Sequence, residues 1–191
     1  MIIQIRVDDR LIHGQIAVVW SKYFATNHLV VANDQAAKNE VQQMTLKMAT
    51  PNGVKVLIRS VDDAIKVFNN PKSETVKMFV LTNSIQDALK IATNCKVESI
   101  NVANVGRFEA ASEKKQLNAD VGCTPKELEA LKEIAKLDME TIHWVIPTNP
   151  KISVNDTVAA SCRAFTKPPP RPDCSFGQYE YLSNPVSASK K

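Results

Sequence analysis

Residues 28–59 read HLVVANDQAAKNEVQQMTLKMATPNGVKVLIR, and this stretch decides the fold. Its two ends, residues 28–33 and 54–59, are short and rich in β-branched residues, so they predict strands. The segment between them predicts a helix over residues 36–50 that stops before Pro51. A connection of this length requires a helical crossover, and apolar strands flanked by helices are typical of a parallel sheet covered on both faces.

The same alternation of strand and helix continues along the chain in both directions. Further strands are predicted at residues 2–7, 76–82, 97–103 and 139–146, and helices are predicted to begin near Gly14, Ser60, Ser84 and Thr124. The start at Thr124 is the clearest, because Pro and Glu follow at the first and third helical positions. The sequence therefore predicts a single doubly wound α/β domain over residues 1–160, with a mostly parallel sheet and helices on both faces.

The last 31 residues differ from the rest of the chain. They hold five of the ten prolines and have neither a helical nor a strand period, so residues 161–191 are predicted to be a flexible or non-native tail. Of the net charge of +4, the tail carries +3 and residues 1–160 carry +1. A body so nearly neutral offers no field that would capture nucleic acid.

Several site classes are excluded by what the sequence lacks. The four cysteines form no C-x-x-C pair and have no His at zinc-ligand spacing, and neither common glycine-rich phosphate loop occurs. No run of 18 apolar residues is present, and the first ten residues do not resemble a signal peptide. We therefore expect a cytoplasmic protein that does not itself span a membrane, with no metal and no cofactor.

The loop DDRLIHGQ, residues 8–15, follows the first predicted strand. Reaction sites in parallel sheets gather at the carboxyl ends of strands, and His13 stands just before a helix whose first N–H groups bind anions. A phosphoryl group on the imidazole would be stabilised by those amides and by Arg10, while Asp8 or Asp9 would hold the other ring nitrogen. Gly14 would allow a close backbone approach. These parts predict nucleophilic catalysis by histidine.

Other polar residues allow a simpler interpretation. A His in a loop is more often structural than catalytic, and an Asp-Asp-Arg cluster is often a surface ion pair, although the position at a strand end favours function. We expect His28 and His143 to serve packing, and Ser60 and Ser84 to cap helices. The residues whose roles stay open are Asn33, Asp34, Asn101 and Arg107.

Four segments together carry a resemblance to a known family. They are RVDDRLIHGQI at 6–16, VAND at 31–34, the helix end at 44–51 ahead of GVK at 53–55, and NVANVGRF at 101–108. In content and order they resemble the IIB components of the mannose/fructose/sorbose family of the bacterial phosphoenolpyruvate-dependent sugar phosphotransferase system, over residues 1 to about 155. The chain departs from the family at Ala103 and Asn104, where glycines are frequent.

The resemblance implies a protein-Npi-phosphohistidine–sugar phosphotransferase. In it, His13 would accept a phosphoryl group from a IIA domain and pass it to a sugar presented by membrane IIC and IID partners, which could hold the protein at the inner face of the membrane. The implied catalytic residues are His13 as phosphocarrier, Arg10 as charge stabiliser and Asp9 as orienting residue. The implied phosphoryl- or partner-binding residues are Arg6, Gly14, Gln15, Asn33 and Asp34.

One alternative from a different class stays open. A regulatory α/β interaction module would keep the same scaffold and His loop and bind phosphotransferase partners without passing phosphate to sugar. The residues do not choose among mannose, fructose, sorbose and amino-sugar systems, and they do not fix the oligomeric state.

Overall fold

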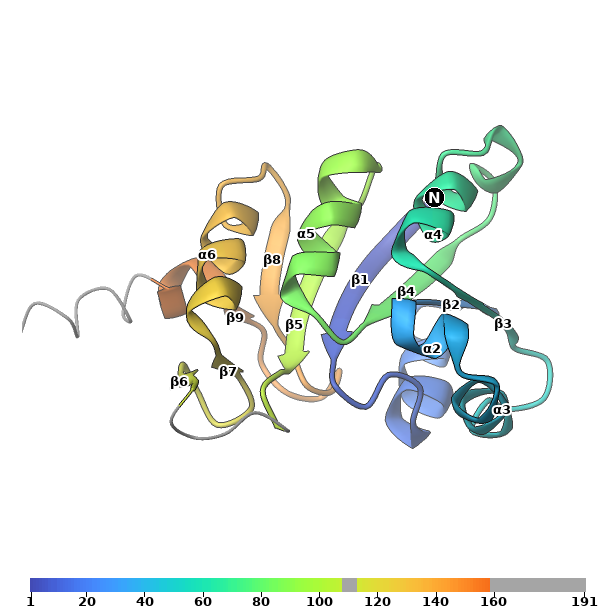
Figure 1. Cartoon of the computed structure of the whole chain (residues 1–191), viewed down its shortest axis with the longest axis horizontal. Coiled ribbons are helices and arrows are strands. Elements are labelled where there is room, and N and C mark those ends of the chain that lie inside the picture. Colours follow the sequence, from blue (N-terminus) through green and yellow to red (C-terminus); the bar gives the residue numbers. More distant parts are fainter. Residues whose placement is uncertain (108–112, 159–191) are drawn as a thin grey trace, which may run out of the picture.

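The computed structural model describes residues 1–107 and 113–158, and a seven-stranded sheet forms its centre (Figure 1). The strand order is β3-β2-β4-β1-β5-β8-β9, and every pairing is parallel except that of β9 with β8. The strands of this sheet are β1 (Ile2–Asp8), β2 (His28–Ala32), β3 (Lys55–Arg59), β4 (Met78–Thr82), β5 (Ser99–Asn104), β8 (Glu140–His143) and β9 (Ile152–Ser153). A separate antiparallel pair joins β6 (Lys115–Gln116) to β7 (Gly122–Cys123).

Helices cover both faces of the sheet, and each face has its own apolar core. One face, called the α5 face here, packs against α4 (Val61–Phe68), α5 (Ile85–Asn94) and α6 (Pro125–Ile134). The other, called the η1 face, packs against η1 (Gln15–Trp20), α1 (Ser21–Tyr23), α2 (Asp34–Lys38) and α3 (Glu40–Met48). A short 3-10 turn, η2 (Pro71–Ser73), precedes β4. The doubly wound α/β fold predicted from the sequence is confirmed.

Helix starts agree closely with the sequence pattern. The hydroxyls of Ser60 and Ser84 accept hydrogen bonds from the backbone N–H groups of Asp63 and Asp87. Thr124 forms a complete capping box, in which the Glu127 carboxylate also accepts from the Thr124 N–H. These caps satisfy backbone donors that a helix leaves unpaired at its start, so the short polar side chains mark the boundaries.

Two predicted helices differ from the observed ones. The single helix expected over residues 36–50 is wrong, because Asn39 ends α2 with extended backbone and caps α3 by accepting from the Gln42 N–H. An Asn side chain competes with the helical backbone for hydrogen bonds, which favours such a break. The helix after Gly14 forms, but residues 15–20 are wound as a π-helix before α1 continues it.

The two edge strands of the sheet are β3, which carries exposed charged side chains, and β9, which is very short. β3 exposes the charged side chains of Lys55 and Arg59, and β9 has only two residues. The strand predicted over residues 139–146 ends at His143, and β6, β7 and β9 were not predicted. The expectation for residues 161–191 lies outside the described residues.

Within residues 1–107 and 113–158, no helix is long and apolar enough to cross a membrane. In the same ranges, no group of three or more His, Cys, Asp or Glu side chains is placed to hold a metal ion.

Candidate functional site

The loop after β1 is held in a tight, defined shape. The Leu11 N–H donates to the Asp8 carbonyl at 2.9 Å, and Leu11 has a φ of 53°. This left-handed conformation costs a residue with a Cβ roughly 1–2 kcal/mol. The side chains of Leu11 and Ile12 are buried in the core of the η1 face, and their burial offsets that cost. The buried side chains of Leu11 and Ile12 therefore anchor the loop to the core, which fixes the positions of the neighbouring Arg10 and His13.

Asp8 is the centre of the site, and its side chain is fully buried. One carboxylate oxygen accepts from the Arg10 N–H and from Arg10 Nε, both at 3.2 Å. The other oxygen accepts from Arg6 Nε at 3.3 Å and from a terminal nitrogen of Arg6 at 3.1 Å. His13 Nε2 lies 3.6 Å from this second oxygen. Two guanidinium groups thus compensate the buried carboxylate, and the imidazole lies against it.

Arg6 is buried beneath the loop. Its guanidinium donates to the backbone carbonyls of Trp144 at 2.9 Å and Val145 at 3.2 Å, and its central carbon lies 5.0 Å from the centre of the Trp20 ring. Burial lowers the pKa of Arg6, and the neighbouring Asp8 opposes that effect. With no exposed surface, Arg6 supports the loop from below and does not itself face an incoming group.

The surroundings of His13 favour a neutral imidazole. Its side chain is 17% exposed, but neither ring nitrogen is accessible to solvent or hydrogen-bonded. Burial lowers the pKa of His13 below 6.5; Asp8 raises it, and Arg10 and Arg6 lower it further. The ring therefore keeps a lone pair at neutral pH, as a nucleophile requires. A ring nitrogen reaches an external group only after the ring turns or the loop shifts.

Asp9 lies apart from the imidazole, although it adjoins Asp8 in sequence. Its carboxylate accepts from the Arg107 N–H at 2.8 Å, and its own N–H donates to the Asn104 carbonyl at 2.9 Å. Burial raises the pKa of Asp9, and the bond from Arg107 opposes the shift. In this geometry Asp8 is the carboxylate beside His13, and Asp9 ties the loop to the end of β5. The orienting role expected of Asp9 stays a prediction.

The bond from the Asp9 N–H also bears on Asn104, a position at which the sequence departs from the family it resembles. Position 104 serves the loop through its backbone carbonyl, which does not depend on the side chain. The glycine that the fold requires here is Gly106, which has a φ of 80°, and a Cβ on it would lie 2.1 Å from the Gly122 carbonyl oxygen.

Gly14 and Gln15 stand at the open side of the loop. A Cβ on Gly14 would meet nothing within 4 Å, and its backbone is right-handed, so the fold itself does not demand glycine here. Gln15 is exposed. The space above Gly14 is thus free for an incoming group, and its predicted role in close approach stays a prediction.

Asn33 and Asp34 are not brought together with His13. Asn33 caps α2 and donates to Asn83 Oδ1 at 2.6 Å, while an Asp34 carboxylate oxygen accepts from the Val61 N–H. Both line a polar hollow of about 430 Å³, whose lining does not include His13. The contacts observed for both residues are with the starts of helices α2 and α4. Their expected part in phosphoryl or partner binding stays a prediction.

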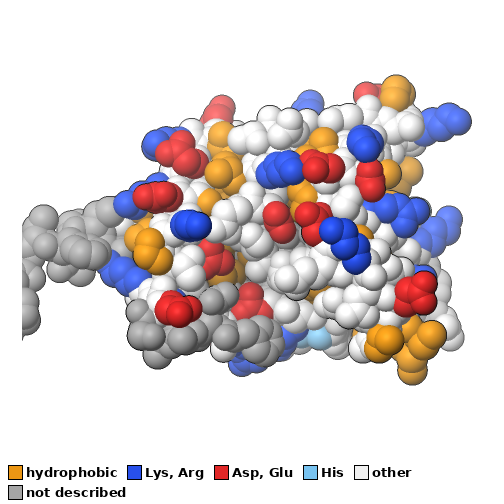
Figure 2. Space-filling view, viewed as in Figure 1, with side chains coloured by type: hydrophobic (Ala, Val, Ile, Leu, Met, Phe, Trp, Pro, Cys, Tyr) orange, Lys and Arg blue, Asp and Glu red, His pale blue; other side chains and the backbone are white. Residues whose placement is uncertain are grey.

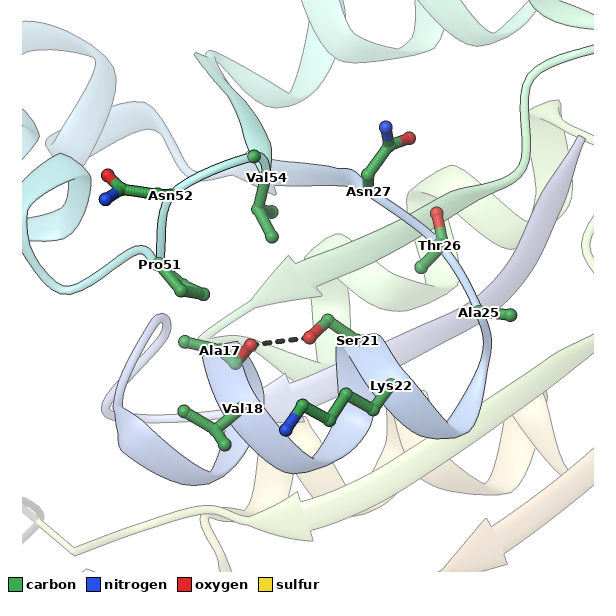
Figure 3. Close-up of a pocket in the computed structure, with 11 residues that line it drawn as sticks. Ala17, Val18, Ser21, Lys22, Ala25, Thr26, Asn27, Pro51, Asn52 and Val54 are labelled. Atoms are coloured by element: carbon green, nitrogen blue, oxygen red, sulfur yellow. Dashed lines mark hydrogen bonds between the residues drawn. The ribbon is translucent and has the colours of Figure 1, made fainter.

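A further hollow of about 670 Å³ lies between η1, α1 and the loop that follows α3 (Figure 3). Ala17, Val18, Ser21 and Lys22 line one side, and the Ser21 hydroxyl is turned back to the Ala17 carbonyl. Its lining holds no His and no carboxylate. The residues with reactive chemistry therefore lie on the loop after β1 and not in this hollow.

Residues 2–164 match a family model described as the PTS system sorbose subfamily IIB component. The chain belongs to this IIB family. A probable phosphotransferase enzyme IIB component of Streptococcus pyogenes is 49% identical over 162 residues, which make up 83% of this chain and 99% of the relative. The sorbose-specific EIIB component of Klebsiella pneumoniae is 31% identical over 153 residues, covering 80% of this chain and 92% of the relative.

Solved structures agree with the family assignment. The crystal structure of the IIBSor domain of the sorbose permease from Klebsiella pneumoniae superimposes on this IIB component with a TM-score of 0.77 at 29% identity. The match covers 84% of this chain and 98% of that domain. The resemblance seen in the sequence segments is thus confirmed at the level of family and fold.

Sequence reasoning missed part of the support beneath the site in this IIB component. The carbonyls of Trp144 and Val145 hold Arg6, and a backbone acceptor leaves no residue-type signal in a sequence. His143, expected to serve packing, is buried, and its Nδ1 lies 2.8 Å from the Val102 carbonyl oxygen.

Proposed function

We propose that this IIB component carries a phosphoryl group on His13, accepting it from a phosphohistidine of a IIA domain and passing it to a sugar. The observation that carries the proposal is the position of the His13 ring, which lies against the buried Asp8 carboxylate that Arg10 also contacts. Burial lowers the pKa of His13, which favours the neutral, nucleophilic ring. Membership of the IIB family supports it, since this is a component of a sugar phosphotransferase system.

Nδ1 of His13 is the proposed nucleophile. Nε2 faces the Asp8 carboxylate at 3.6 Å, which favours the proton on Nε2 and the lone pair on Nδ1. A shift of the loop would expose Nδ1 while Nε2 stays against Asp8. As Nδ1 then bonds to phosphorus, the bond from phosphorus to the donor imidazole breaks and the donor ring recovers its lone pair. The phosphorylated ring carries a positive charge with its Nε2 proton, and Asp8 stabilises that charge. A phosphoryl group on Nε2 would instead meet the carboxylate and be repelled.

Arg10 is the described cation best placed to meet the transferred group. Its side chain is 31% exposed, and Asp8 holds it at the base of the loop. A phosphoryl group adds roughly −1.5 to −2 charge at neutral pH, which a guanidinium can bind in a forked geometry. On transfer to sugar, a hydroxyl oxygen bonds to phosphorus while the bond from phosphorus to Nδ1 breaks and Nδ1 recovers its lone pair. The hydroxyl proton passes to solvent, and His13 returns to the neutral ring with its proton on Nε2.

The proposed partners are a IIA domain and the membrane IIC and IID subunits, which would place this cytoplasmic protein at the inner face of the membrane. The mannose-specific EIIAB component of Escherichia coli is 30% identical over 154 residues, and the match spans 47% of that longer chain. In Figure 1, α3 and the loop after β1 both lie in the lower part of the view. Helix α3 exposes Val41, Met44 and Met48. Figure 2 shows apolar side chains gathered at the place of α3. Exposed apolar surface of this kind supports contact with proteins.

Intact mass measurement tests the covalent step. The protein is incubated with phosphoenolpyruvate, enzyme I, the histidine phosphocarrier protein and a cognate IIA. We expect one acid-labile phosphoryl group in the wild type and in a His28→Ala control, and none in His13→Ala. A phosphoryl group that persists in His13→Ala would refute the assignment. Phosphorylation that yields no sugar phosphate in membranes holding IIC and IID would favour the regulatory module instead.

The proposed domain boundary is tested by truncation. We expect removal of residues 161–191 to leave phosphorylation of His13 unchanged, because every contact described for the site lies before residue 159. Loss of phosphorylation in the truncated protein would show that the segment belongs to the function.

A further inference from the structure

A row of buried polar side chains lies on the η1 face, on the neighbouring strands β1 and β5. In the parallel register, Arg6 of β1 pairs with Asn101 of β5. The buried polar side chains of the row are Gln4, Arg6, Asp8, Ser99 and Asn101. Buried polar groups are costly unless they are hydrogen-bonded, so each member of this row depends on its partners being held in place.

Asn101 lies in the middle of the row, and every polar group of its side chain is paired. Its Oδ1 accepts from the Trp144 N–H at 3.0 Å, and its Nδ2 donates to the Trp144 carbonyl at 2.8 Å. Nδ2 also lies 3.3 Å from Gln4 Oε1, to which it donates. The orientation of the amide is fixed by these partners, because a backbone N–H can only donate. Asn101 therefore clamps the backbone of residue 144 from both sides.

The clamped backbone is what holds Arg6. The Trp144 carbonyl that accepts from Asn101 also accepts from Arg6, and the next carbonyl, of Val145, accepts from another nitrogen of the same guanidinium. The Trp20 ring NH donates to the Val145 carbonyl as well, at 3.3 Å. Two carbonyls in a fixed relation thus set the plane of the Arg6 guanidinium.

Arg6 passes this orientation on to the reacting ring. Its fork approaches one oxygen of Asp8, and this is the oxygen that lies 3.6 Å from His13 Nε2. Asn101, Arg6 and Asp8 are all fully buried, so none of them contacts a partner protein. The chain of contacts runs without a break from β5, through the segment after β8, to the loop after β1.

We propose that Asn101 is a positioning residue for phosphoryl transfer: it fixes the backbone of Trp144 and Val145, which orients Arg6, which in turn holds Asp8 against the His13 ring. This inference rests on the proposed function of His13. It adds a residue that makes no contact with His13 and stands 88 positions further along the chain.

Two substitutions of Asn101 in the full chain, each compared with a matched control, test the inference. Asn101→Ala removes the clamp, and Asn101→Ser shortens it so that it cannot reach both groups of Trp144. The control is Ser99→Ala, on the same strand and the same face, which removes a buried hydroxyl bonded to Gln4 and to the Ile3 carbonyl but leaves the clamp intact. Thermal unfolding gives the folded fraction of each variant, so that rates refer to folded protein.

Two readouts separate positioning from general destabilisation. In the first, nitrogen NMR of the His13 ring above its pKa measures how much of the neutral ring carries its proton on Nε2. In the second, the rate of phosphorylation is measured over a range of phospho-IIA concentrations. For Asn101→Ala we expect a lower Nε2–H population and a maximal rate about 10-fold lower, with an unchanged half-saturating concentration of IIA, because a small misplacement of the ring slows transfer without altering the docking surface. For Ser99→Ala we expect both readouts to match the wild type.

A wild-type tautomer population and rate in folded Asn101→Ala would overturn the proposal, and so would equal losses in Ser99→Ala. If the alanine variant does not fold, the serine variant decides by the same criteria. A wild-type protein that accepts no phosphoryl group would refute the proposed function instead, and the tautomer measurement would still test the link from Asn101 to the ring.

Discussion

The two faces of β1 differ in what they bury. On the α5 face, Ile5 and Val7 join a core of apolar side chains. On the η1 face, Gln4, Arg6 and Asp8 are buried as deeply, and each is hydrogen-bonded. Apolar burial is favourable by itself, whereas a buried ion pair is favourable only while all its partners are in place. The α5 face of β1 therefore contributes mainly to stability. The polar side chains on the η1 face orient the residues of the loop that follows the strand.

A cluster of aromatic side chains surrounds the polar residues on the η1 face of β1. Trp20 packs edge-on against Trp144 with ring centres 4.9 Å apart, and Phe24 and Phe79 extend the cluster. These rings exclude water from around Arg6, and exclusion of water strengthens its bonds to Asp8 and to the backbone carbonyls. The same exclusion makes any unpaired member of the network costly, so the two faces are expected to respond differently to mutation.

Arg6→Met should have the largest effect. It leaves the Asp8 carboxylate buried without its principal partner, which is expected to lower the free energy of unfolding by about 3–5 kcal/mol. Phosphorylation of the remaining folded protein should also be slow, because Asp8 loses its orientation. Denaturant unfolding and intact mass measurement check the two effects. Arg6→Lys is the control that keeps the charge without the fork, and full activity in Arg6→Met would contradict the role of the polar face.

The second largest expected effect is the fall of the phosphorylation rate at low pH. In the proposed mechanism only the neutral imidazole of His13 attacks phosphorus, so the rate should fall about tenfold per pH unit below the pKa of His13. Because burial lowers that pKa, the midpoint of the profile is expected below 6.5. The unfolded chain binds more protons at this position than the folded one, so acidification through the same range also lowers the free energy of unfolding. A midpoint above 6.5, measured with a phospho-IIA donor of constant state, would contradict the environment described for the ring.

Ile5→Val probes the opposite face of the same strand. Ile5 is fully buried in the core of the α5 face, next in sequence to Arg6. Loss of one methylene should lower the free energy of unfolding by about 0.5–1.5 kcal/mol. The phosphorylation rate of the folded protein should stay at the wild-type value. A clear loss of rate would show that the two faces are not separable.

Asp9→Asn should have the smallest effect of all. Its amide oxygen can still accept from the Arg107 N–H, and Asp9 does not face the ring, so we expect a change in phosphorylation rate of roughly twofold or less. The matched variant Asp8→Asn, one residue earlier, should slow phosphorylation far more, because the ring loses the carboxylate that favours its reactive tautomer. Equal effects of the two substitutions would refute the division of roles between the neighbouring carboxylates.

The fold was predictable because its signals are local. Short polar caps such as Ser60 and Thr124 and the β-branched strands of residues 28–32 and 55–59 each follow from a few neighbouring residues. The break between α2 and α3 at Asn39 could not be predicted, because an Asn inside an amphipathic pattern is compatible with either a continuous or an interrupted helix. Packing of α2 and α3 against the sheet decides between them.

The site was predictable in part. The reactive loop follows from its position after the first strand and from its residue types, but the choice between Asp8 and Asp9 depends on which face each side chain meets. That choice is set by the last residue of β1, and strand ends are the least certain part of a sequence pattern. The support from the carbonyls of Trp144 and Val145 depends on tertiary structure alone.

The edges of the sheet bear on how this protein behaves when it meets other chains. An exposed strand edge is a template on which a second chain can form further backbone hydrogen bonds, and a long, flat edge promotes aggregation. Here one edge strand, β3, exposes Lys55 and Arg59, and at the other edge β9 offers only two residues in the antiparallel sense. The exposed charges on β3 and the shortness of β9 therefore oppose the addition of a further strand at either edge of the described sheet.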